Sequence, residues 1–275
     1  MPETFAGLSL NRPIVMGIIN VTPDSFSDGG EAFAHDQAIH RGTRMIADGA
    51  TILDIGGEST RPGAQPVSID EEIDRVVPVI KGLRNQDTVI SIDTRHPEVM
   101  QAAVDAGAGV INDVTALDHQ VGSVDVASRL GVPVILMHMQ GRPETMQANP
   151  TYEDAPSDVG NFLADRVGAC VKAGIAKVDI AIDPGIGFGK TLQHNLQILN
   201  RIDEFADIGC ALVLGVSRKS LIGDITGERD PQQRLPGSLA AAVLARQHGV
   251  QIFRVHDVAE TVQALSIADA ICQVS

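Results

Sequence analysis

The sequence is poor in aromatic residues and in cysteine. It contains no tryptophan and one tyrosine, and aromatic residues make up 3% of its 275 positions. Proteins that hold single-stranded nucleic acid by base stacking normally carry more aromatic side chains. The three cysteines form no CxxC pair, which argues against a disulfide framework and against a thiolate zinc site. Because hydrophobic residues still make up 44% of the chain, we expect a large core built from aliphatic side chains.

Positive charge is also scarce. The chain has 21 Lys and Arg against 35 Asp and Glu, a formal net charge of −14. Nucleic acids and anionic lipid surfaces are bound through a basic face, so we expect neither as a partner. The N-terminus lacks the charged start and apolar run of a signal peptide. No apolar stretch approaches the roughly 18–20 residues of a membrane span, and we expect a cytoplasmic protein.

Short apolar runs alternate with longer amphipathic segments along the whole chain. The expected strands cover residues 14–19, 52–55, 88–92, 109–112, 133–138, 178–182, 211–216 and 251–255. The expected helices cover residues 36–49, 69–83, 97–106, 123–130, 157–173, 194–205, 238–247 and 259–273. Continuous apolar runs are typical of parallel strands that are buried on both faces. Eight such units predict an α/β fold, a closed (β/α)8 TIM barrel, with an open doubly wound sheet as the alternative.

No linker or low-complexity tract divides the chain, so we expect residues 1–275 to form one domain. Two strand–helix connections are unusually long, at about residues 21–35 and 58–68, and both are rich in Gly, Ser, Thr and Pro. Compact folds rarely keep such loops without a function, and lids or binding loops are the common reason. We therefore interpret both as binding loops.

Every expected strand ends in a polar residue. In chain order these are Asn20, Asp54, Asp93, Asn112 with Asp113, His138, Asp183, Ser217 and His256. The active sites of (β/α)8 barrels lie at this end of the strands. A single member such as Asp54 could instead cap the following helix, and His138 is more simply interpreted as a hydrogen-bonded residue of the barrel interior. The eight together favour a polar site.

The residue types at this end suit a flat heterocycle and an anion. Asp93, Asn112 and Asp183 accept or donate hydrogen bonds as a guanidine-like ring edge requires, and Lys219 adds a cationic donor. Arg254 and His256 share one face of the last strand, so both can reach one anion.

Residues 183–190, DPGIGFGK, resemble a phosphate-binding loop but lack the GxxxxGK[ST] spacing. Their glycines indicate either a tight turn or a close approach of Phe188 to a planar ligand. Lys190 is expected to be solvated.

The motifs, taken in order, resemble those of the dihydropteroate synthase family. They are residues 20–30 (NVTPDSFSDGG), 54–63 (DIGGESTRPG), 91–94 (SIDT), 111–114 (INDV), 137–141 (MHMQG), 183–190, 217–220 (SRKS) and 254–257 (RVHD). The resemblance spans about residues 17–257. It implies a homodimeric, pterin-binding TIM barrel that joins p-aminobenzoate to 6-hydroxymethyl-7,8-dihydropterin diphosphate. The products would be 7,8-dihydropteroate and diphosphate, in folate biosynthesis, with sulfonamides as competitive ligands.

The same resemblance implies a set of site residues. The pterin pocket would comprise Asp93, Asn112, Met137, Asp183, Phe188, Gly215, Lys219 and Arg254. Thr60, Arg61, Arg254 and His256 match the diphosphate contacts, and Phe26, Pro62, Lys219 and Ser220 match the p-aminobenzoate pocket. Asn20 matches the magnesium position, with Asp28 as a candidate second ligand. Arg61, Lys219, Arg254 and His256 would be the catalytic residues.

Three alternatives to this activity stay open at the level of sequence. A pterin-dependent methyltransferase can use the same barrel, but it would not need residues 22–30, 217–220 and 254–256 together. A homologue that only binds a pterin should carry damaged chemical positions, and none is found. An aldolase-like barrel would place a Schiff-base lysine within a strand, whereas Lys219 follows one. Residues 238–245, SLAAAVLA, are apolar nearly all round, which fits a helix covered by a partner or by internal packing.

Overall fold

Eight parallel strands form a closed barrel in the structure, a computed structural model that describes residues 2–21, 30–59, 67–141 and 145–272. In order around the barrel they are β3 (Ile14–Asn20), β4 (Ile52–Gly56), β5 (Val89–Asp93), β6 (Val110–Asp113), β7 (Val134–Met137), β8 (Ile180–Asp183), β9 (Ala211–Leu214) and β10 (Ile252–Val255). The barrel closes where β10 pairs with β3, for example Arg254 beside Met16. The predicted (β/α)8 architecture is confirmed, and the open sheet is excluded.

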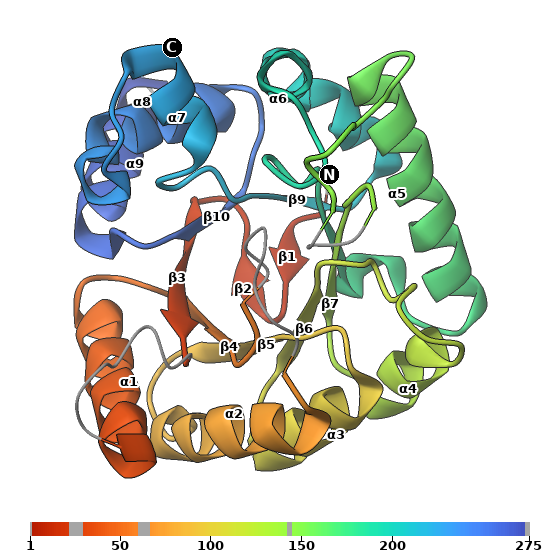
Figure 1. The fold of residues 1–275 in the computed structure, drawn as a ribbon, viewed down its shortest axis with the longest axis vertical. Coiled ribbons are helices and arrows are strands. Elements are labelled where there is room, and N and C mark those ends of the chain that lie inside the picture. Colours follow the sequence, from red (N-terminus) through yellow and green to blue (C-terminus); the bar gives the residue numbers. More distant parts are fainter. Residues whose placement is uncertain (1, 22–29, 60–66, 142–144, 273–275) are drawn as a thin grey trace.

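Helices surround the barrel on its outside (Figure 1). They are α1 (Gly30–Ala47), α2 (Ile69–Leu83), α3 (Pro97–Ala106), α4 (Ser123–Leu130), α5 (Ala155–Lys172), α6 (Leu192–Asn200), α7 (Ser220–Thr226), α8 (Leu235–Gln247) and α9 (Val258–Cys272). The bounds of α2, α3 and α4 match the prediction. The helix predicted at 194–205 is wrong in part, because it divides into α6 and a 3-10 helix, Ile202–Ile208. Helix α7 was not predicted, and α1 begins at Gly30, whereas residue 36 was predicted.

A short hairpin closes the amino-terminal end of the barrel. Strands β1 (Thr4–Phe5) and β2 (Leu8–Ser9) pair antiparallel, and the two residues between them, Ala6 and Gly7, both have positive φ, at 50° and 75°. Such a two-residue turn matches the twist of a hairpin. Phe5 is buried beneath the barrel in a cluster that includes Met16 and Ile52. The hairpin therefore fills the amino-terminal end of the barrel with apolar side chains.

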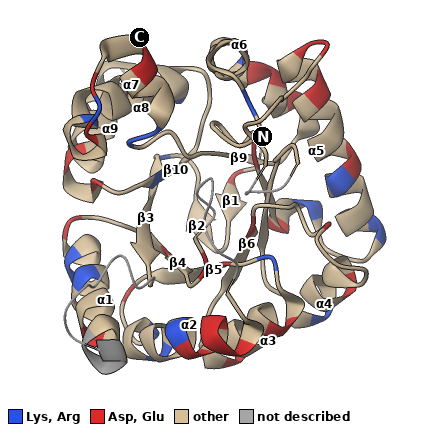
Figure 2. Cartoon of the chain, in the orientation of Figure 1, with Lys and Arg blue, Asp and Glu red and all other residues tan. Residues whose placement is uncertain are grey.

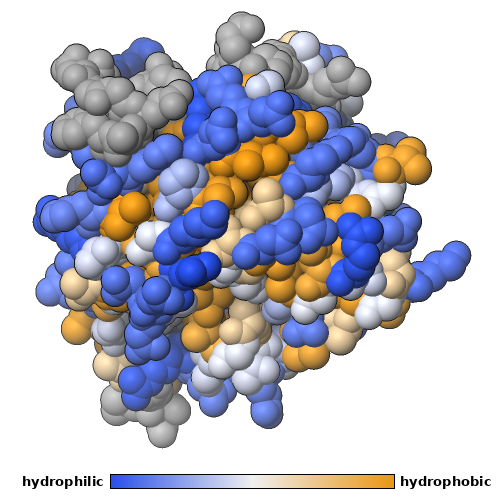
Figure 3. All heavy atoms as spheres, turned by 90° about the horizontal axis from the view of Figure 1, so that it is seen from below, coloured by the Kyte–Doolittle hydropathy of each residue, from blue (hydrophilic) through white to orange (hydrophobic). Residues whose placement is uncertain are grey.

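The core is aliphatic, as the composition predicts. Between barrel and helices, buried side chains such as Ile19, Leu53 and Ile92 form one continuous cluster. Lys, Arg, Asp and Glu lie mainly on the outer helices and loops (Figure 2). On the side of α2 and α3, hydrophilic side chains interrupt the apolar patches (Figure 3). Within the described residues, no helix has the length and hydropathy that crossing a bilayer requires.

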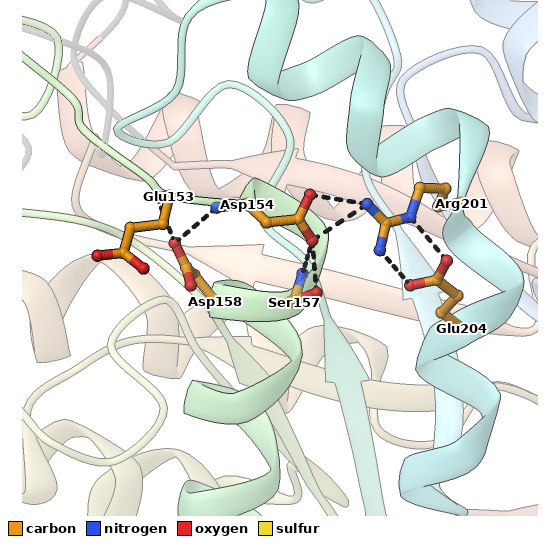
Figure 4. Close-up of polar contacts among 6 residues, drawn as sticks. All are labelled: Glu153, Asp154, Ser157, Asp158, Arg201 and Glu204. Atoms are coloured by element: carbon orange, nitrogen blue, oxygen red, sulfur yellow. Dashed lines mark hydrogen bonds and ion pairs between the residues drawn. The ribbon is translucent and has the colours of Figure 1, made fainter.

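A surface network fixes the start of α5 against the end of α6 (Figure 4). Asp154 caps α5 by accepting a hydrogen bond from the backbone N–H of Ser157, and Arg201 Nη1 donates to Asp154 Oδ1 at 2.7 Å. The same guanidinium pairs with Glu204, Nε to Oε1 at 2.7 Å. Exposed pairs of this kind contribute little to stability. They do, however, set where the chain before α5 lies, and that chain contains Tyr152, which contacts the loop after β8.

Candidate active site

Arg254, on β10, connects several strands at the carboxyl end of the barrel. Its Nε donates to Oδ2 of Asp54 at 2.6 Å, and its Nη2 donates to Oδ2 of Asp93 at 2.6 Å. Asn112 Nδ2 donates to the same Asp54 oxygen at 3.1 Å. Asp54 is fully buried, and a carboxylate at that depth needs a paired cation. Asp54 is thus a structural partner of Arg254, a role that the sequence analysis did not assign.

Asp93 is a much weaker acid than an exposed aspartate. Burial raises the pKa of Asp93 to about 7, although the adjacent Arg254 acts in the opposite direction. A carboxyl group with this pKa exchanges between an acceptor form and a donor form near neutral pH. Asp93 can therefore match either a donor or an acceptor on the edge of a heterocycle.

Three charged side chains converge around Gly215, which follows β9. A β-carbon placed at Gly215 would lie 3.7 Å from Asp183 Oδ2, 3.8 Å from Lys219 Nζ and 3.9 Å from Arg254 Cβ. A side chain at this position would therefore lie in van der Waals contact with all three residues. The other carboxylate oxygen of Asp183 accepts a hydrogen bond from the backbone N–H of Gly185 at 2.7 Å. Asp183 Oδ2 is therefore the oxygen directed toward Gly215 and Lys219.

Lys219 lies between Asp183 and the loop after β8. Its Nζ donates to the carbonyl oxygen of Ile186 and lies 4.6 Å from the centre of the Phe188 ring, a cation–π distance. Burial lowers the pKa of Lys219 to about 8, while Asp183 opposes the shift. Lys219 is still mostly protonated at pH 7, so it can donate to a ring carbonyl or nitrogen.

His256, just beyond β10, is held by Ser217 just beyond β9. The imidazole Nδ1 lies 3.1 Å from Ser217 Oγ, and the backbone N–H of His256 donates to the same oxygen at 3.2 Å. Burial, together with the neighbouring Arg254, Arg218 and Arg41, lowers the pKa of His256 to about 3. The neutral imidazole of His256 could donate a hydrogen bond to an anion but would not carry a positive charge. Ser217, a strand end and the first residue of the SRKS motif in the sequence, is thus the hydrogen-bond partner of His256.

The chain matches known proteins over nearly its whole length. The family model for pterin binding enzymes matches residues 16–256. The dihydropteroate synthase of Escherichia coli K12 is 48% identical over 264 residues, which cover 96% of this chain and 93% of the E. coli protein. The chain belongs to the dihydropteroate synthase family.

Solved dihydropteroate synthases agree with the whole fold. The Yersinia pestis enzyme in complex with a sulfonamide drug superimposes with a TM-score of 0.93 at 48% identity, covering 100% of both chains. The Xanthomonas albilineans enzyme in complex with 7,8-dihydropteroate superimposes with a TM-score of 0.89 at 46% identity, covering 98% of this chain and 97% of that one. The barrel and its connections are therefore those of dihydropteroate synthases.

The structure brings together most of the residues that the resemblance assigns to a pterin pocket. Arg254 contacts Asp93, and it lies with Asp183 and Lys219 around Gly215. Phe188 stacks on Lys219, and Asn112 joins the group through Asp54. Met137, at the end of β7, is buried beside Gly185.

The remaining predicted site residues lie at the rim or beyond the described part of the chain. Asn20 is half-buried at the end of β3, and Ser220 is exposed at the first position of α7. Phe26, Asp28, Thr60, Arg61 and Pro62 lie outside the described residues. Of the second predicted loop, 58–68, the structure describes both ends. Glu58 Oε1 accepts from Arg95 Nη2 at 3.0 Å and from the backbone N–H of Val67 at 3.4 Å, so one carboxylate joins the two ends of the loop.

The glycine-rich segment after β8 is a tight turn packed against the chain that follows β7. Gly185, Gly187 and Gly189 have φ of +68°, +83° and +61°. A β-carbon at Gly185 would lie 1.9 Å from the carbonyl oxygen of His138, which only glycine avoids. The expectation that Lys190 is solvated is wrong: its side chain is buried and its Nζ lies 2.8 Å from His138 Nδ1. The interpretation of His138 as an interior hydrogen-bonded residue is confirmed.

Two histidines, the buried His138 and the half-buried His256, make the stability of the fold sensitive to acid. Burial lowers the pKa of His138 and of His256 to about 3, against 6.5 for a free histidine. Between pH 3 and 6.5 the unfolded chain therefore binds protons at these sites that the folded chain does not, so stability rises with pH over this window. Asp93 and Asp113, whose pKa values burial raises to about 7 and about 6, act with the opposite sign.

His256→Gln should reduce this acid sensitivity. Each histidine contributes up to about 1.4 kcal/mol of unfolding free energy per pH unit within the window, so the variant should lose roughly one such contribution to the slope. Urea unfolding at pH 4, 5 and 6 measures it, with His40→Gln at an exposed histidine as the control. Equal slopes in the wild type and in His256→Gln would contradict a neutral His256.

Proposed function

We propose that this chain condenses 6-hydroxymethyl-7,8-dihydropterin diphosphate with p-aminobenzoate, giving 7,8-dihydropteroate and diphosphate. The arrangement of Asp183, Lys219 and Arg254 around Gly215 carries the proposal, because it places the acceptor Asp183 Oδ2 and the cationic donor Lys219 Nζ beside β10, where Arg254 pairs with Asp93. Family membership supports it, as does the solved relative that contains 7,8-dihydropteroate. A (β/α)8 barrel alone would not, because the fold hosts many unrelated activities.

The pocket residues divide the recognition of the pterin between them. Asp183 Oδ2 would accept from the N–H groups of the guanidine-like edge, and Lys219 Nζ would donate to a ring acceptor. The side-chain amide of Asn112 donates a hydrogen bond to Asp54, so its side-chain oxygen can accept one from the pterin. Phe188 would cover one face of the ring system. These contacts hold the methylene carbon in a fixed place relative to the outer rim of the barrel.

The chemistry itself is the departure of diphosphate and its replacement by an amine. The bond between the pterin methylene carbon and the diphosphate oxygen breaks with both electrons going to oxygen, and the ring delocalises the positive charge left on carbon. The arylamine nitrogen then forms the new C–N bond and loses a proton to solvent. Cationic and hydrogen-bonding groups near the leaving oxygen, Arg254 and His256, lower the barrier by matching the developing charge. The arylamine is neutral at pH 7, so no general base is required.

The rim of the barrel fits a magnesium ion that is bound mainly through substrate. Mg²⁺ prefers oxygen ligands and commonly uses one or two protein groups together with phosphate oxygens and water. Asn20 offers a carboxamide oxygen at the end of β3, and the described residues contain no group of three or more His, Cys, Asp or Glu that would form a dedicated cage. A bound Mg²⁺ would neutralise the charge of the diphosphate leaving group. Asp28 is the proposed second ligand.

Asn20→Ala should raise the Mg²⁺ concentration that half-activates the enzyme by about tenfold, the equivalent of one lost ligand interaction of about 1.4 kcal/mol. Diphosphate release measured across a Mg²⁺ titration after chelation tests this, with Asn11→Ala, at an exposed position, as the matched control. An unchanged midpoint in Asn20→Ala, or full activity in excess chelator, would rule out the assignment.

A direct assay tests the proposed reaction. Incubation with the pterin diphosphate, p-aminobenzoate and Mg²⁺ should give 7,8-dihydropteroate and one diphosphate per product. Omitting p-aminobenzoate should remove the product. A pterin-dependent methyltransferase would release no diphosphate, and a non-catalytic pterin binder would return both substrates unchanged, so either result would overturn the proposal.

We also propose that two copies of the chain associate through α6, α7 and α8, which lie together at the top of Figure 1. Leu196, Ile225 and Leu244, one from each helix, are 37%, 57% and 60% exposed and line a groove between the helices. An apolar surface that repeats on a second copy can pair with itself about a twofold axis. The apolar stretch 238–245 is thereby explained, since α8 buries only Ser238, Ala242 and Ala245 within its own chain.

Leu244→Glu should convert the dimer into a monomer, because a desolvated carboxylate facing its own symmetry mate is costly at an interface. Sedimentation velocity at micromolar concentration measures the change. Val121→Glu, at a fully exposed valine outside this groove, should leave the dimer intact. A monomeric wild type, or a dimeric Leu244→Glu, would refute the proposed interface.

Two lesser assignments follow from the same site and composition. We propose that sulfonamides compete with p-aminobenzoate here, supported by the Yersinia pestis relative that contains such a drug. We also propose a cytoplasmic location, supported by Cys170 and Cys210, which are free thiols in the interior.

A further inference from the structure

The buried Lys190 has no role in the chemistry described above, yet it is among the best-satisfied polar groups of the site. Its Nζ lies 2.9 Å from the carbonyl oxygen of Gly185, 3.0 Å from that of Phe188 and 2.8 Å from His138 Nδ1. The side chain is 3% exposed. A buried amine of this kind is costly unless every contact is productive. Its retention therefore calls for a function in the turn that surrounds it.

We propose that Lys190 is the positioning residue of the pterin pocket, holding the turn at residues 185–188 in the shape that ligand binding requires. The inference rests on the proposed pterin site. Lys190 Nζ donates to the carbonyl oxygens at both ends of the turn, Gly185 and Phe188, and Lys219 Nζ donates to that of Ile186 between them. It touches neither the proposed pterin nor the reacting atoms, so it acts through the backbone.

The whole turn is held by side chains, which shows that its shape is specified. The carbonyl oxygens of residues 185 to 189 all accept a side-chain hydrogen bond. In order, the donors are Lys190, Lys219, Gln147, Lys190 and Tyr152. In addition, the Gly187 N–H donates to Asn195 Oδ1 at 2.8 Å. A turn rich in glycine has many accessible conformations, so it needs such contacts to adopt one.

Two groups of the proposed pterin pocket depend directly on Gly185 and Phe188, the residues that Lys190 holds. The backbone N–H of Gly185 fixes one oxygen of Asp183, so the orientation of that carboxylate follows the position of Gly185. Phe188 carries the ring that stacks on Lys219. A displacement of the turn would therefore misplace the acceptor and the stacking face for the pterin together.

The arrangement does not depend on a charged lysine. Burial and the nearby Lys219 lower the pKa of Lys190 well below its usual range. A neutral amine still has two N–H groups, one for each of the two carbonyl oxygens, and its third contact is a ring nitrogen that can donate or accept. Either protonation state holds the turn, so the carbonyl contacts and not the charge define the role.

Lys190→Met keeps the length and volume of the side chain and removes its donors. We expect the dissociation constant for the pterin diphosphate, measured by calorimetry, to rise by about 30-fold, as expected when buried acceptors lose their donor. The KM for the pterin substrate should rise similarly, while kcat at saturation falls by less than about threefold. Amide hydrogen exchange at Gly185 and Phe188 should accelerate in the absence of ligand.

The matched control is Leu83→Ala, which removes a fully buried side chain from the far end of α2. It should lower the Tm and leave both pterin affinity and exchange at residues 185–188 unchanged. If Lys190→Met binds the pterin like the wild type, or if Leu83→Ala weakens binding equally, the positioning role is overturned. If Lys190→Met does not fold, Lys190→Gln is measured in its place, and wild-type binding and exchange would again overturn the role. A wild type that does not bind the pterin would reject the proposed function, while the exchange measurement would still decide the role of Lys190.

Discussion

Asp183→Asn should weaken pterin binding by at least about 100-fold, the scale of a charge-assisted acceptor replaced by a donor. The substitution is nearly isosteric. Its carbonyl oxygen can keep the hydrogen bond from the Gly185 N–H, so the turn after β8 should stay in place. The amide nitrogen would then replace Oδ2, the oxygen that faces Gly215 and Lys219. The new amide N–H would then face the N–H groups of the pterin edge. The site would also lose the negative charge of Asp183, which raises the pKa of Lys219.

Calorimetry with the pterin diphosphate measures this loss, and circular dichroism with a Tm confirms that the barrel is folded. Asp203→Asn, at an exposed position of the 3-10 helix after α6, is the matched control and should bind normally. Unchanged affinity in a folded Asp183→Asn would contradict the assignment of Asp183 to the pterin. A fall in kcat without a change in affinity would place Asp183 in the chemical step instead.

The positions of the strand ends could be predicted because they depend on local pattern alone. An apolar run that is buried on both faces must end where polar residues begin, and parallel strands bring those ends to one side of the barrel. Asp93, Asn112 and Asp183 were therefore located without knowledge of any contact. Which side chains pair with one another is a different question. Arg254 meets Asp54 and Asp93 across 200 and 161 residues of sequence, and barrel closure decides that pairing.

Lys190 shows the limit of local reasoning most clearly. The segment before it contains three glycines, which are typical of exposed turns, so solvation is the natural expectation. The burial comes from residues that are distant in sequence: His138 follows β7 and Tyr152 precedes α5. The hairpin β1–β2 was missed for another reason, because strands of two residues are too short to show a period. Contacts made by other segments of the chain, more than propensity, therefore decide these features.

Arg254→Met should be strongly destabilising, by about 3–5 kcal/mol, the usual cost of removing one partner from a buried ion pair. The guanidinium contacts two carboxylates, and Asp54 beside it is fully buried. Without the cation, Asp54 and Asp93 would face each other with Asn112 as a neutral donor to Asp54. The pKa of Asp93, already raised to about 7 by burial, should rise further because Arg254 is the group that lowers it.

The stability that Arg254→Met loses should therefore increase with pH. When the folded pKa of a carboxyl exceeds its unfolded value, the folded state binds the proton more tightly, so stability falls as pH rises between the two values. In the wild type this window for Asp93 runs from about 4 to about 7, and in Arg254→Met it should extend to higher pH. Urea unfolding should then show a larger deficit at pH 8 than at pH 5.

A second substitution separates the structural role of Arg254 from its catalytic role. Asp93→Asn removes the carboxyl group whose pKa Arg254 lowers. The double variant should therefore recover part of the stability at pH 8 and lose most of the added pH dependence. Activity should not recover with it, because the proposed diphosphate contact and the proposed pterin contact would both still be missing. If Arg254→Met is as stable as the wild type at both pH values, the two carboxylates do not need the cation, and Arg254 would serve the ligand alone.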